Sequence, residues 1–322
     1  MRDVLVTENI VGSEMESLKS RFDVAFEPEL WSTPARLQEM IIDFRAIIVR
    51  NQTRVNSELI ASAPHLQVIG RAGAGLDNID LDAASSAGIV VAYTPEQNAV
   101  SVAELTIGMM LALARKIIPA HQSTQAGGWK RRESTGTELY GKTLGLVGLG
   151  RIGYRVGARA KGFGMDLVAY DLYANPDAIT VSESFARMMD LDELLGFADF
   201  VSCHVPLTSE TLGLFDYEKF CKMKQTAYFI NTSRGEVVDE EALVQALEQK
   251  RIAGAGLDVR QQEPPEEGPL SRMDNVILTP HIGAFTREGQ DRVVSSVCRD
   301  VAAILEGGEA RNYFSLSKPK RM

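Results

Sequence analysis

The sequence predicts an α/β protein built from two domains, each with a largely parallel sheet. Short apolar runs rich in β-branched residues alternate with amphipathic segments almost throughout, which is typical of parallel strand–helix–strand units. The alternation stops at a long apolar segment near residue 100 and then starts again. The length, 322 residues, gives room for two domains of ordinary size.

The first series precedes residue 100. Its expected strands are short and β-branched, and its expected helices carry one apolar face. The strands are predicted at residues 4–6, 46–49, 67–70 and 89–91, and the helices near residues 13–20, 34–42 and 56–63.

A long helical segment follows, from about residue 99 to residue 125. It has apolar side chains on every side, which predicts burial in a core or an interface. Pro119 is expected to kink it, because proline removes a helical hydrogen bond and its ring crowds the preceding turn. The polar, glycine-containing stretch 127–132 is expected to be an exposed connection.

The second series supplies further strands and a final helix. The strands are predicted at residues 143–147, 166–170, 200–203, 227–230, 254–257 and 276–278, and the helix at about 287–305. With the final helix crossing back to the first series, one domain comprises residues 1–98 plus 287–322 and the other residues 99–286. Residues 318–322 are expected to form a loose tail.

Composition and charge exclude several classes of protein. The chain is 45% hydrophobic and 24% charged, as ordinary globular proteins are. Its net charge of −9 argues against broad nucleic-acid or membrane-surface binding, which needs a basic face. The 3 cysteines fit neither a disulfide framework nor a metal site, so no metal is expected. The N-terminus does not read as a signal peptide and no apolar run is long enough to span a bilayer, so a cytoplasmic protein is predicted.

Gly148, Gly150 and Gly153 form the pattern G-x-G-x-x-G between a strand-like run and a helical one. The first glycine permits a tight turn, the second lets backbone amides approach a pyrophosphate, and the third lets the helix pack closely on the strand. The pyrophosphate would lie at the positive N-terminus of that helix. A strand–turn–helix that merely needs glycines is the alternative, but Asp171 at the end of the next strand favours the nucleotide. Its carboxylate would accept hydrogen bonds from ribose hydroxyls and repel a 2′-phosphate, which predicts NAD over NADP.

Arg234, Glu263 and His281 follow predicted strand ends, where ligands bind in open α/β sheets. Hydride transfer at carbon 2 of a hydroxy acid needs a base for the hydroxyl proton and a cation for the carboxylate. His281 can be the base, and Arg234 can hold the carboxylate with its planar fork of donors. Glu263 would orient His281 and stabilise its charged form. Each residue has an alternative: a structural histidine, a loop-capping arginine and a solvated glutamate.

These segments resemble the D-isomer-specific 2-hydroxyacid dehydrogenase family over nearly the whole chain. The matching runs are the glycine motif, Asn-Thr-Ser-Arg-Gly, Asp-Val followed by Glu-Pro, and Pro-His-Ile-Gly. The resemblance implies a Rossmann-type NAD-binding domain, a smaller flavodoxin-like α/β substrate domain, and a homodimer formed through the NAD-binding domain. It also implies that Arg234, Glu263 and His281 are catalytic and that His204 is not the acid–base residue. The implied cofactor-binding residues are Gly148, Gly150, Arg151, Ile152, Gly153, Asp171, His204, Val205, Pro206, Thr232, Ser233, Asp258, Gly283 and Ala284.

Within that family, the first domain most resembles the phosphoglycerate dehydrogenases, in a short form without a regulatory domain. The implied reaction converts D-3-phosphoglycerate to 3-phosphohydroxypyruvate, a step of serine biosynthesis. Backbone amides of the glycine-rich turn at residues 73–75 could hold a carboxylate, and Arg50 and Arg71 could reach a phosphate. The basic stretch 128–132 could reach a partner's active site or simply face water. The implied substrate-binding residues are Arg50, Arg71, Gly73, Ala74 and Gly75.

Two departures leave the substrate open. Ala74 stands where this branch often has threonine, so one cofactor hydrogen bond is expected to be lost, and Phe285 stands where a small polar residue is usual. Phe285 is expected to narrow the pocket or move its loop. The alternatives are a glyoxylate/hydroxypyruvate reductase, another D-2-hydroxyacid dehydrogenase, or an NAD-sensing co-repressor-like binding protein, since a shared fold does not fix function.

Overall fold

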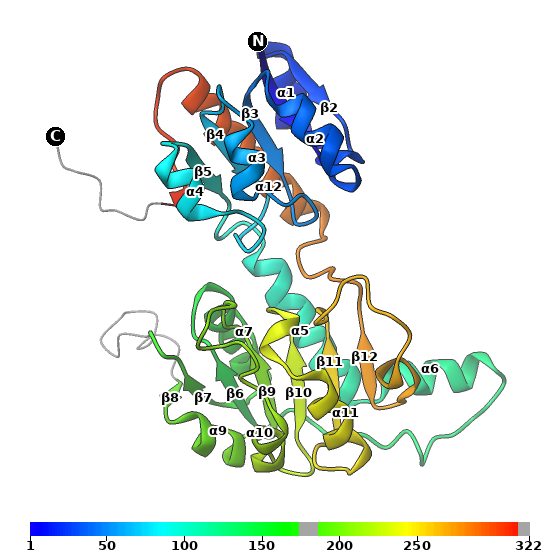
Figure 1. The fold of residues 1–322 in the computed structure, drawn as a ribbon. Helices are drawn as coiled ribbons and strands as arrows, with labels where there is room; N and C mark the ends of the chain where they lie inside the picture. The colour runs from blue at the N-terminus through cyan, green and yellow to red at the C-terminus, as the bar shows by residue number, and fades with distance from the viewer. Residues whose placement is uncertain (174–185, 315–322) are drawn as a thin grey trace. The chain divides into compact units, whose positions relative to one another are not determined.

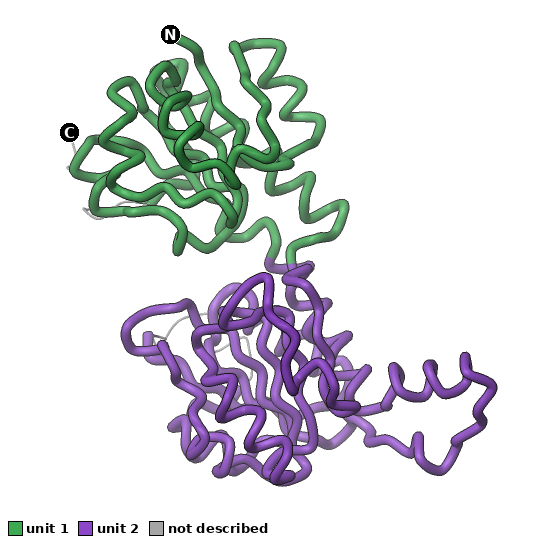
Figure 2. Tube along the Cα trace, turned by 45° about the vertical axis from the view of Figure 1, so that its right-hand side comes forward, with its two compact units in different colours: residues 1–98, 284–322 green, residues 99–283 purple. Residues whose placement is uncertain are grey.

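The computed structural model describes residues 1–173 and 186–314. The chain divides into two compact units (Figure 2), unit 1 comprising Met1–Asn98 with Ala284–Met322 and unit 2 comprising Ala99–Gly283. The second boundary thus falls after residue 283, where the sequence analysis placed it after residue 286. The tail expected at residues 318–322 lies outside the described residues.

Unit 1 contains a six-stranded sheet in the order β13-β5-β4-β3-β1-β2. All neighbouring strands are parallel except β13, which runs antiparallel to β5. The order 2-1-3-4-5 of the parallel strands is that of flavodoxin-like sheets, as predicted. The strands are β1 (Arg2–Val6), β2 (Val24–Phe26), β3 (Phe44–Val49), β4 (Val68–Arg71), β5 (Val90–Tyr93) and β13 (Tyr313–Phe314).

Helices cover both faces of this sheet, because its strands bury side chains on both sides. Along β1, Val4 and Val6 enter one apolar cluster and Leu5 enters the other. The final helix packs on β4 across Gly70, where a Cβ atom would lie 2.6 Å from a methyl group of Val301. The helices are α1 (Ser13–Arg21), η1 (Leu30–Ser32), α2 (Pro34–Ile41), α3 (Ser57–Ala61), α4 (Leu81–Ser86) and α12 (Arg287–Leu305), as labelled in Figure 1 except for the short η1.

Unit 2 contains a seven-stranded parallel sheet in the order β12-β11-β10-β9-β6-β7-β8. Counted from its own first strand, this is the order 3-2-1-4-5-6 of dinucleotide-binding sheets, extended by one strand. The predicted Rossmann-type domain is therefore confirmed. The strands are β6 (Thr143–Val147), β7 (Asp166–Tyr170), β8 (Arg187–Met188), β9 (Phe200–Cys203), β10 (Tyr228–Asn231), β11 (Gly254–Leu257) and β12 (Val276–Leu278).

Two apolar clusters, one on each face of the sheet, form the core of unit 2. One contains Phe215, Phe220 and Phe229, whose ring centroids lie 4.7 to 6.1 Å apart. The other packs α7 against β6 and β7, and α5 against α7, β10 and β11. The helices are α5 (Ala99–Ala114), α6 (Ile117–Gln125), α7 (Arg151–Gly162), α9 (Leu191–Phe197), α10 (Tyr217–Lys222), η2 (Gly235–Val237), α11 (Glu240–Glu248) and η3 (Pro269–Arg272).

The single kinked helix expected over residues 99–125 is wrong, because two helices occupy that segment. The first helix, α5, ends at Ala114. Lys116 then has a left-handed φ of 49°, which interrupts the helical conformation, and α6 begins at Ile117. Pro119 therefore lies in the first turn of α6, where its missing N–H would have no helical partner in any case. In a continuous helix its ring would crowd the carbonyl group of Arg115, which explains why the break precedes it by one turn.

Burial of that segment in a core is confirmed for α5, whereas α6 is exposed on unit 2 and the interface reading stays a prediction for it. Ten residues of α5 are buried, whereas α6 has none, and the side chains of Ile117 and Ile118 are 52% and 39% exposed. Within unit 2, α6 and the connection after it extend away from the sheet (Figures 1 and 2). Among the described residues, no helix is long and apolar enough to cross a membrane.

Candidate active site

A glycine turn joins β6 to α7 at the carboxyl edge of the sheet. Gly148 has a left-handed φ of 96°, and a Cβ atom there would lie 2.8 Å from the backbone of His204. A Cβ atom on Gly153 would lie 2.1 Å from the carbonyl oxygen of Gly148, so α7 can pack on the turn only with glycine at this position. Gly150 is the N-cap of α7 and supplies no side-chain cap. An uncapped helix start behind a narrow turn suits a pyrophosphate.

Asp171 follows β7 and already holds the glycine turn in place. Its Oδ2 accepts a hydrogen bond from the amide of Leu149 at 2.7 Å, and its Oδ1 accepts one from the amide of Tyr173 at 2.8 Å. A carboxylate has about four acceptor positions, so two remain for ribose hydroxyls. Its negative charge beside the turn disfavours a 2′-phosphate.

Arg234 follows β10 on a turn that the buried side chain of Asn231 closes. The Asn231 Nδ2 donates to the carbonyl oxygen of Arg234 at 2.8 Å, and its Oδ1 accepts from the amide and the hydroxyl of Ser233 at 3.0 and 2.8 Å. The Arg234 Nη1 also donates to the carbonyl oxygen of Ser233 at 2.7 Å. Thr232, in the same turn, shares a hydroxyl hydrogen bond of 3.0 Å with Thr106 of α5. These contacts fix the backbone from which the guanidinium extends.

His281 and Glu263 form the pair that the sequence predicted. Nδ1 of His281 lies 2.7 Å from Oε2 of Glu263, and the two side chains are 37% and 33% exposed. Burial raises the pKa of Glu263, but its hydrogen bond to His281, the charges of His281 and Arg234, and the amide of Arg260 outweigh this and lower it overall. Glu263 is therefore ionised at neutral pH.

His204 lies under the glycine turn and is half-buried, with the ring nitrogen Nδ1 enclosed. Its Nε2 lies 2.8 Å from the hydroxyl of Ser202, and its amide donates to Val147 at 2.7 Å. Burial lowers the pKa of His204 to about 3, so the ring is neutral at physiological pH. A neutral ring packed beneath the turn fits the expectation that His204 is not the acid–base residue. Val205 and Pro206 continue this loop beyond β9.

The predicted substrate residues lie in unit 1, on the loops after β3 and β4. The Arg50 guanidinium lies over the ring of Phe285, 5.3 Å from its centroid, and donates to Oε1 of Gln290. Burial lowers the pKa of Arg50, although the charge of Glu8 opposes this. Arg71 folds back over Gly73, where a Cβ atom would lie 1.5 Å from its Nη1. Ala74 and Gly75 continue that turn and are partly exposed.

Residues 107–283 match the model of the D-isomer specific 2-hydroxyacid dehydrogenase family, NAD binding domain. The match covers more than half of the chain, and it contains the glycine turn, Asp171 and the His281–Glu263 pair.

The chain belongs to the D-isomer specific 2-hydroxyacid dehydrogenase family.

Individual family members align over almost the whole chain. A protein of Methanocaldococcus jannaschii named D-3-phosphoglycerate dehydrogenase is 42% identical over 316 residues, which are 98% of this chain and 60% of that protein. The chain spans 56% to 60% of the length of the first three such relatives. The TT0316 protein of Thermus thermophilus superimposes with a TM-score of 0.91 at 36% identity, covering 97% of this chain and 100% of that one. D-lactate dehydrogenase of Aquifex aeolicus, solved with NAD and lactic acid, gives a TM-score of 0.87 at 28% identity, covering 98% and 100%.

Membership of this family confirms the predicted NAD-binding domain and accounts for the motif order. The roles of individual residues stay predictions. Phe285 was expected to narrow the pocket or move its loop. In the structure its ring is 57% exposed and lies against the Arg50 guanidinium within unit 1.

Three residues that hold predicted site residues within their own unit were not singled out from the sequence: Asn231 in unit 2, and Glu8 and Gln290 in unit 1. Asn231 was in principle detectable, because asparagine directly after a strand commonly closes a turn through its side chain. The carboxylate of Glu8 accepts hydrogen bonds from the backbone amides of Arg50, Gln52 and Thr53 at 2.7, 3.2 and 3.0 Å. Gln290, on α12, accepts a hydrogen bond from the Arg50 guanidinium through its Oε1. Neither is marked by spacing or composition, since their partners lie far away in the sequence.

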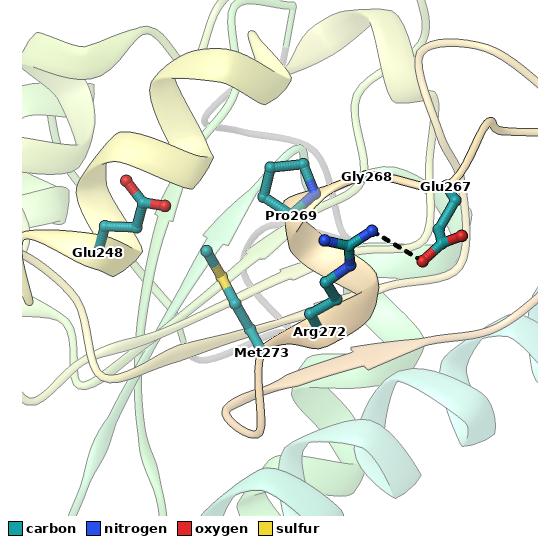
Figure 3. A pocket seen from close by; sticks show the side chains of 6 residues that line it. All are labelled: Glu248, Glu267, Gly268, Pro269, Arg272 and Met273. Atoms are coloured by element: carbon teal, nitrogen blue, oxygen red, sulfur yellow. Dashed lines mark hydrogen bonds and ion pairs between the residues drawn. The ribbon is translucent and has the colours of Figure 1, made fainter.

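A surface hollow of about 580 Å³ lies beside η3, and none of the predicted site residues lines it (Figure 3). The hollow is lined by Glu248, Glu267, Gly268, Pro269, Arg272 and Met273. Its polar feature is the ion pair between Arg272 and Glu267, 2.9 Å long, with side chains 72% and 75% exposed. An ion pair so exposed contributes little. Within residues 1–173 and 186–314, no group of three or more His, Cys, Asp and Glu side chains could hold a metal ion.

Proposed function

We propose that the protein is an NAD-dependent oxidoreductase that interconverts a small D-2-hydroxy acid and its 2-oxo acid. The observation that carries this proposal is the His281–Glu263 pair, 2.7 Å apart, in the same unit as a glycine turn suited to a dinucleotide. Family membership and the tight turn that carries Arg234 support it. The proposed catalytic residues are Arg234, Glu263 and His281.

In the proposed reaction, the glycine turn and Asp171 would hold NAD, which would supply the hydride acceptor for carbon 2. Arg234 binds the substrate carboxylate through its planar fork of donors. His281 takes the hydroxyl proton as the C–H bond breaks, so that hydride and proton leave together and a 2-oxo acid forms. Glu263, ionised and bonded to Nδ1, holds the ring and stabilises its protonated form until the proton returns to water.

For the substrate, we propose D-3-phosphoglycerate and 3-phosphohydroxypyruvate, as in serine biosynthesis. Relatives named D-3-phosphoglycerate dehydrogenase align over 98% of this chain at 42% and 43% identity. Arg50 and Arg71 are the proposed phosphate-binding side chains, with the turn at Gly73, Ala74 and Gly75 as a further anion-binding segment.

A glyoxylate/hydroxypyruvate reductase is the second candidate, and one observation favours it. The Arg50 guanidinium is already engaged by Phe285 and Gln290, which leaves fewer of its donors for a phosphate. A smaller, unphosphorylated acid would need fewer cationic contacts.

Assays with a panel of 2-oxo acids distinguish the candidates. NADH oxidation is measured with and without a phosphate on the substrate, and NAD reduction is measured with the matching hydroxy acids. Arg50→Ala should sharply reduce kcat/KM for phosphorylated substrate, while Arg54→Ala, at an exposed arginine on the same loop, should not. If Arg50→Ala leaves that kcat/KM unchanged, the phosphoglycerate proposal fails. That result would support the glyoxylate/hydroxypyruvate reductase instead.

His281→Ala tests the catalytic assignment directly. Loss of a general base typically lowers the rate about 10²- to 10⁴-fold, whereas NADH should still bind. Isothermal calorimetry with NADH gives the second readout. Loss of NADH binding would make His281 structural.

We further propose a homodimer formed through the NAD-binding domain, in the cytoplasm. Exposed Ile117 and Ile118 on α6 and Trp129, 78% exposed on the following connection, support an interface there. Three free cysteines are consistent with a reducing compartment. Sedimentation velocity of the wild type and of Ile117→Glu tests the dimer; a wild-type monomer would refute it.

A further inference from the structure

Glu263, the proposed partner of His281, is carried by an exposed loop. Residues 261–267 follow the buried Val259 closely and are all exposed. A carboxylate on such a loop keeps its 2.7 Å contact with Nδ1 of His281 only where other residues support the loop. The amide of Arg260 donates to Oε1 of Glu263 at 3.1 Å and so holds the second carboxylate oxygen. The position of Glu263 therefore depends on what fixes Arg260.

An ion pair with Glu240, the first residue of α11, fixes Arg260. The Nε of Arg260 donates to Oε1 of Glu240 at 2.9 Å, and its Nη2 donates to Oε2 at 2.7 Å. The two side chains are 13% and 20% exposed, so solvent screens this pair less than an ion pair on the open surface. Because two donors of the planar guanidinium are engaged, the pair fixes the orientation of Arg260 as well as its distance from α11.

Glu240 also holds the backbone of the loop. Its Oε1 accepts a hydrogen bond from the amide of Gln261 at 2.6 Å. The start of α11 is capped by Asp239, whose Oδ1 accepts two amides of the first turn. The carboxylate of Glu240 is thus directed at two consecutive residues of the loop, Arg260 and Gln261, while its neighbour caps the helix.

Close packing places the same loop beside the turn that carries Arg234. Gly235 follows Arg234, and a Cβ atom on Gly235 would lie 2.0 Å from the carbonyl carbon and oxygen of Arg260. It would also lie 2.4 Å from the amide nitrogen of Gln261. The backbone of the loop therefore passes against residue 235 at a distance that only glycine permits. The ion pair keeps the loop in this place.

We propose that Arg260 and Glu240 are positioning residues that hold Glu263 against His281. The proposal rests on the proposed function, in which Glu263 stabilises the protonated form of His281. The ion pair acts on the reaction through Glu263. Breaking the pair should therefore lower kcat no further than removing the charge of Glu263 does.

Glu240→Gln tests the ion pair with a side chain of the same size. Its NH₂ group replaces one carboxylate oxygen and faces a donor of Arg260 or Gln261 instead of accepting from it. We expect kcat to fall about tenfold, as for a lost hydrogen bond to a charged group. The dissociation constant of NADH should stay unchanged, because Asp171 still holds the glycine turn.

Glu241→Gln is the matched control, because it makes the same change at the next residue, which is exposed. This control should keep the kcat of the wild type. Equal kcat in Glu240→Gln and Glu241→Gln would overturn the proposal.

A double variant separates positioning from a general effect on the fold. In Glu263→Gln the charge that the ion pair positions is already absent, so adding Glu240→Gln should change kcat by less than about twofold. The same tenfold loss in both backgrounds would overturn the proposal. Arg260→Lys decides the question if Glu240→Gln does not fold. It keeps the positive charge but lacks the planar fork, and its loss of kcat should likewise disappear in Glu263→Gln; an equal loss with and without the charge of Glu263 would refute the role of Arg260.

Amide hydrogen exchange supplies a readout that does not depend on turnover. In Glu240→Gln the amide of Arg260 should exchange faster, because Glu263 no longer stays in place to accept from it. The amide of Leu149, held by Asp171, should not change. Unchanged exchange at Arg260 would refute the role of the ion pair. If the wild-type enzyme shows no turnover with any 2-oxo acid, the proposed function fails, and the exchange measurement still tests whether the ion pair holds Glu263.

Discussion

Replacing Glu263 by glutamine tests the acid–base pair with a minimal change in shape. The glutamine keeps an oxygen that can accept from Nδ1 of His281 but removes the negative charge 2.7 Å from the ring. The variant therefore separates the charge of Glu263 from its hydrogen-bond geometry.

The expected loss follows from the geometry and the exposure of the pair. A hydrogen bond to a charged group contributes about 1.5–3 kcal/mol, or roughly 10- to 150-fold in rate if it acts only while His281 is charged. Because the side chains are 33% and 37% exposed, solvent screening favours the lower part of that range. We therefore expect kcat to fall about 10- to 30-fold at pH 7.

The pH dependence has a definite sign. Because the pKa of Glu263 is lowered in the folded protein, its charge persists as the pH falls through the usual carboxylate range near 4.3. The difference in kcat between wild type and Glu263→Gln should therefore hold from pH 8 to pH 5 and shrink only below the ordinary glutamate pKa. The same sign applies to stability: what the ionised Glu263 contributes is present above its unfolded pKa and lost as the pH falls through the folded one.

The assay is steady-state NADH oxidation from pH 5 to pH 9, with saturating 2-oxo acid. Glu266→Gln is the matched control, because it makes the same change of charge three residues away on an exposed side chain. A Glu263→Gln enzyme within twofold of wild type across this range would show that Glu263 does not stabilise His281 and would refute the reasoning.

Three further predictions concern the cofactor site and the core of unit 2. Asp171→Ser should weaken NADH binding without producing equally tight NADPH binding, because the amide of Leu149 loses its acceptor; fluorescence titration with both nucleotides measures this, and tight NADPH binding would contradict it. Gly153→Ala should strongly weaken NADH binding in the same titration, because the new Cβ atom would lie 2.1 Å from the carbonyl oxygen of Gly148, and wild-type affinity would show that the turn adapts. Phe229→Ala should lower the free energy of unfolding by about 3–5 kcal/mol, because the ring is fully buried. Urea unfolding followed by circular dichroism measures this, and a loss under about 1 kcal/mol would mean that the aromatic cluster repacks.

The strands that build the two sheets were predictable because their side chains are buried on both faces. Thr143–Val147 is one example: every residue is buried, and the run is apolar except at its first residue. The missed strands, β2, β8 and β13, have 3, 2 and 2 residues and lie at the edges of their sheets. Runs so short carry no periodicity. The interruption of the helix at Lys116 was missed because the sequence signal is Pro119, and the helix is interrupted one turn before that proline.

The proposed reactive side chains could be chosen from the sequence, but most of the residues that hold them in place could not. Arg234, Glu263 and His281 have chemistry that a 2-hydroxy acid requires, and each follows a strand-like run. The bond from Asn231 to Arg234 is local and was within reach of a turn rule. The bonds that Asp258 makes to residues 279–283 depend on the alignment of β11 and β12, which no pattern in the sequence gives.

Three carboxylates share one structural role in the separate sheets. Glu8 follows β1, Asp171 follows β7 and Asp258 follows β11, and each accepts at least two backbone amides from loops at the carboxyl edge of its sheet. Loop amides there lie beyond the strand ladders and need other acceptors, which a short anionic side chain at a strand end provides.

This arrangement would let a negatively charged protein present loops to the anionic ligands proposed above. Each carboxylate accepts hydrogen bonds from backbone amides, while the loop that it orders carries Arg50, the glycine turn or His281, the proposed acid–base residue. Arg50 depends on Glu8 in this way, and His281 on Asp258. Preorganised loops contribute more to a reaction than loops ordered by the ligand, because binding energy is not spent on ordering them. Exchanging the ligand-facing side chains should therefore change specificity while the protein stays folded, whereas exchanging the carboxylates should reduce turnover on every substrate alike.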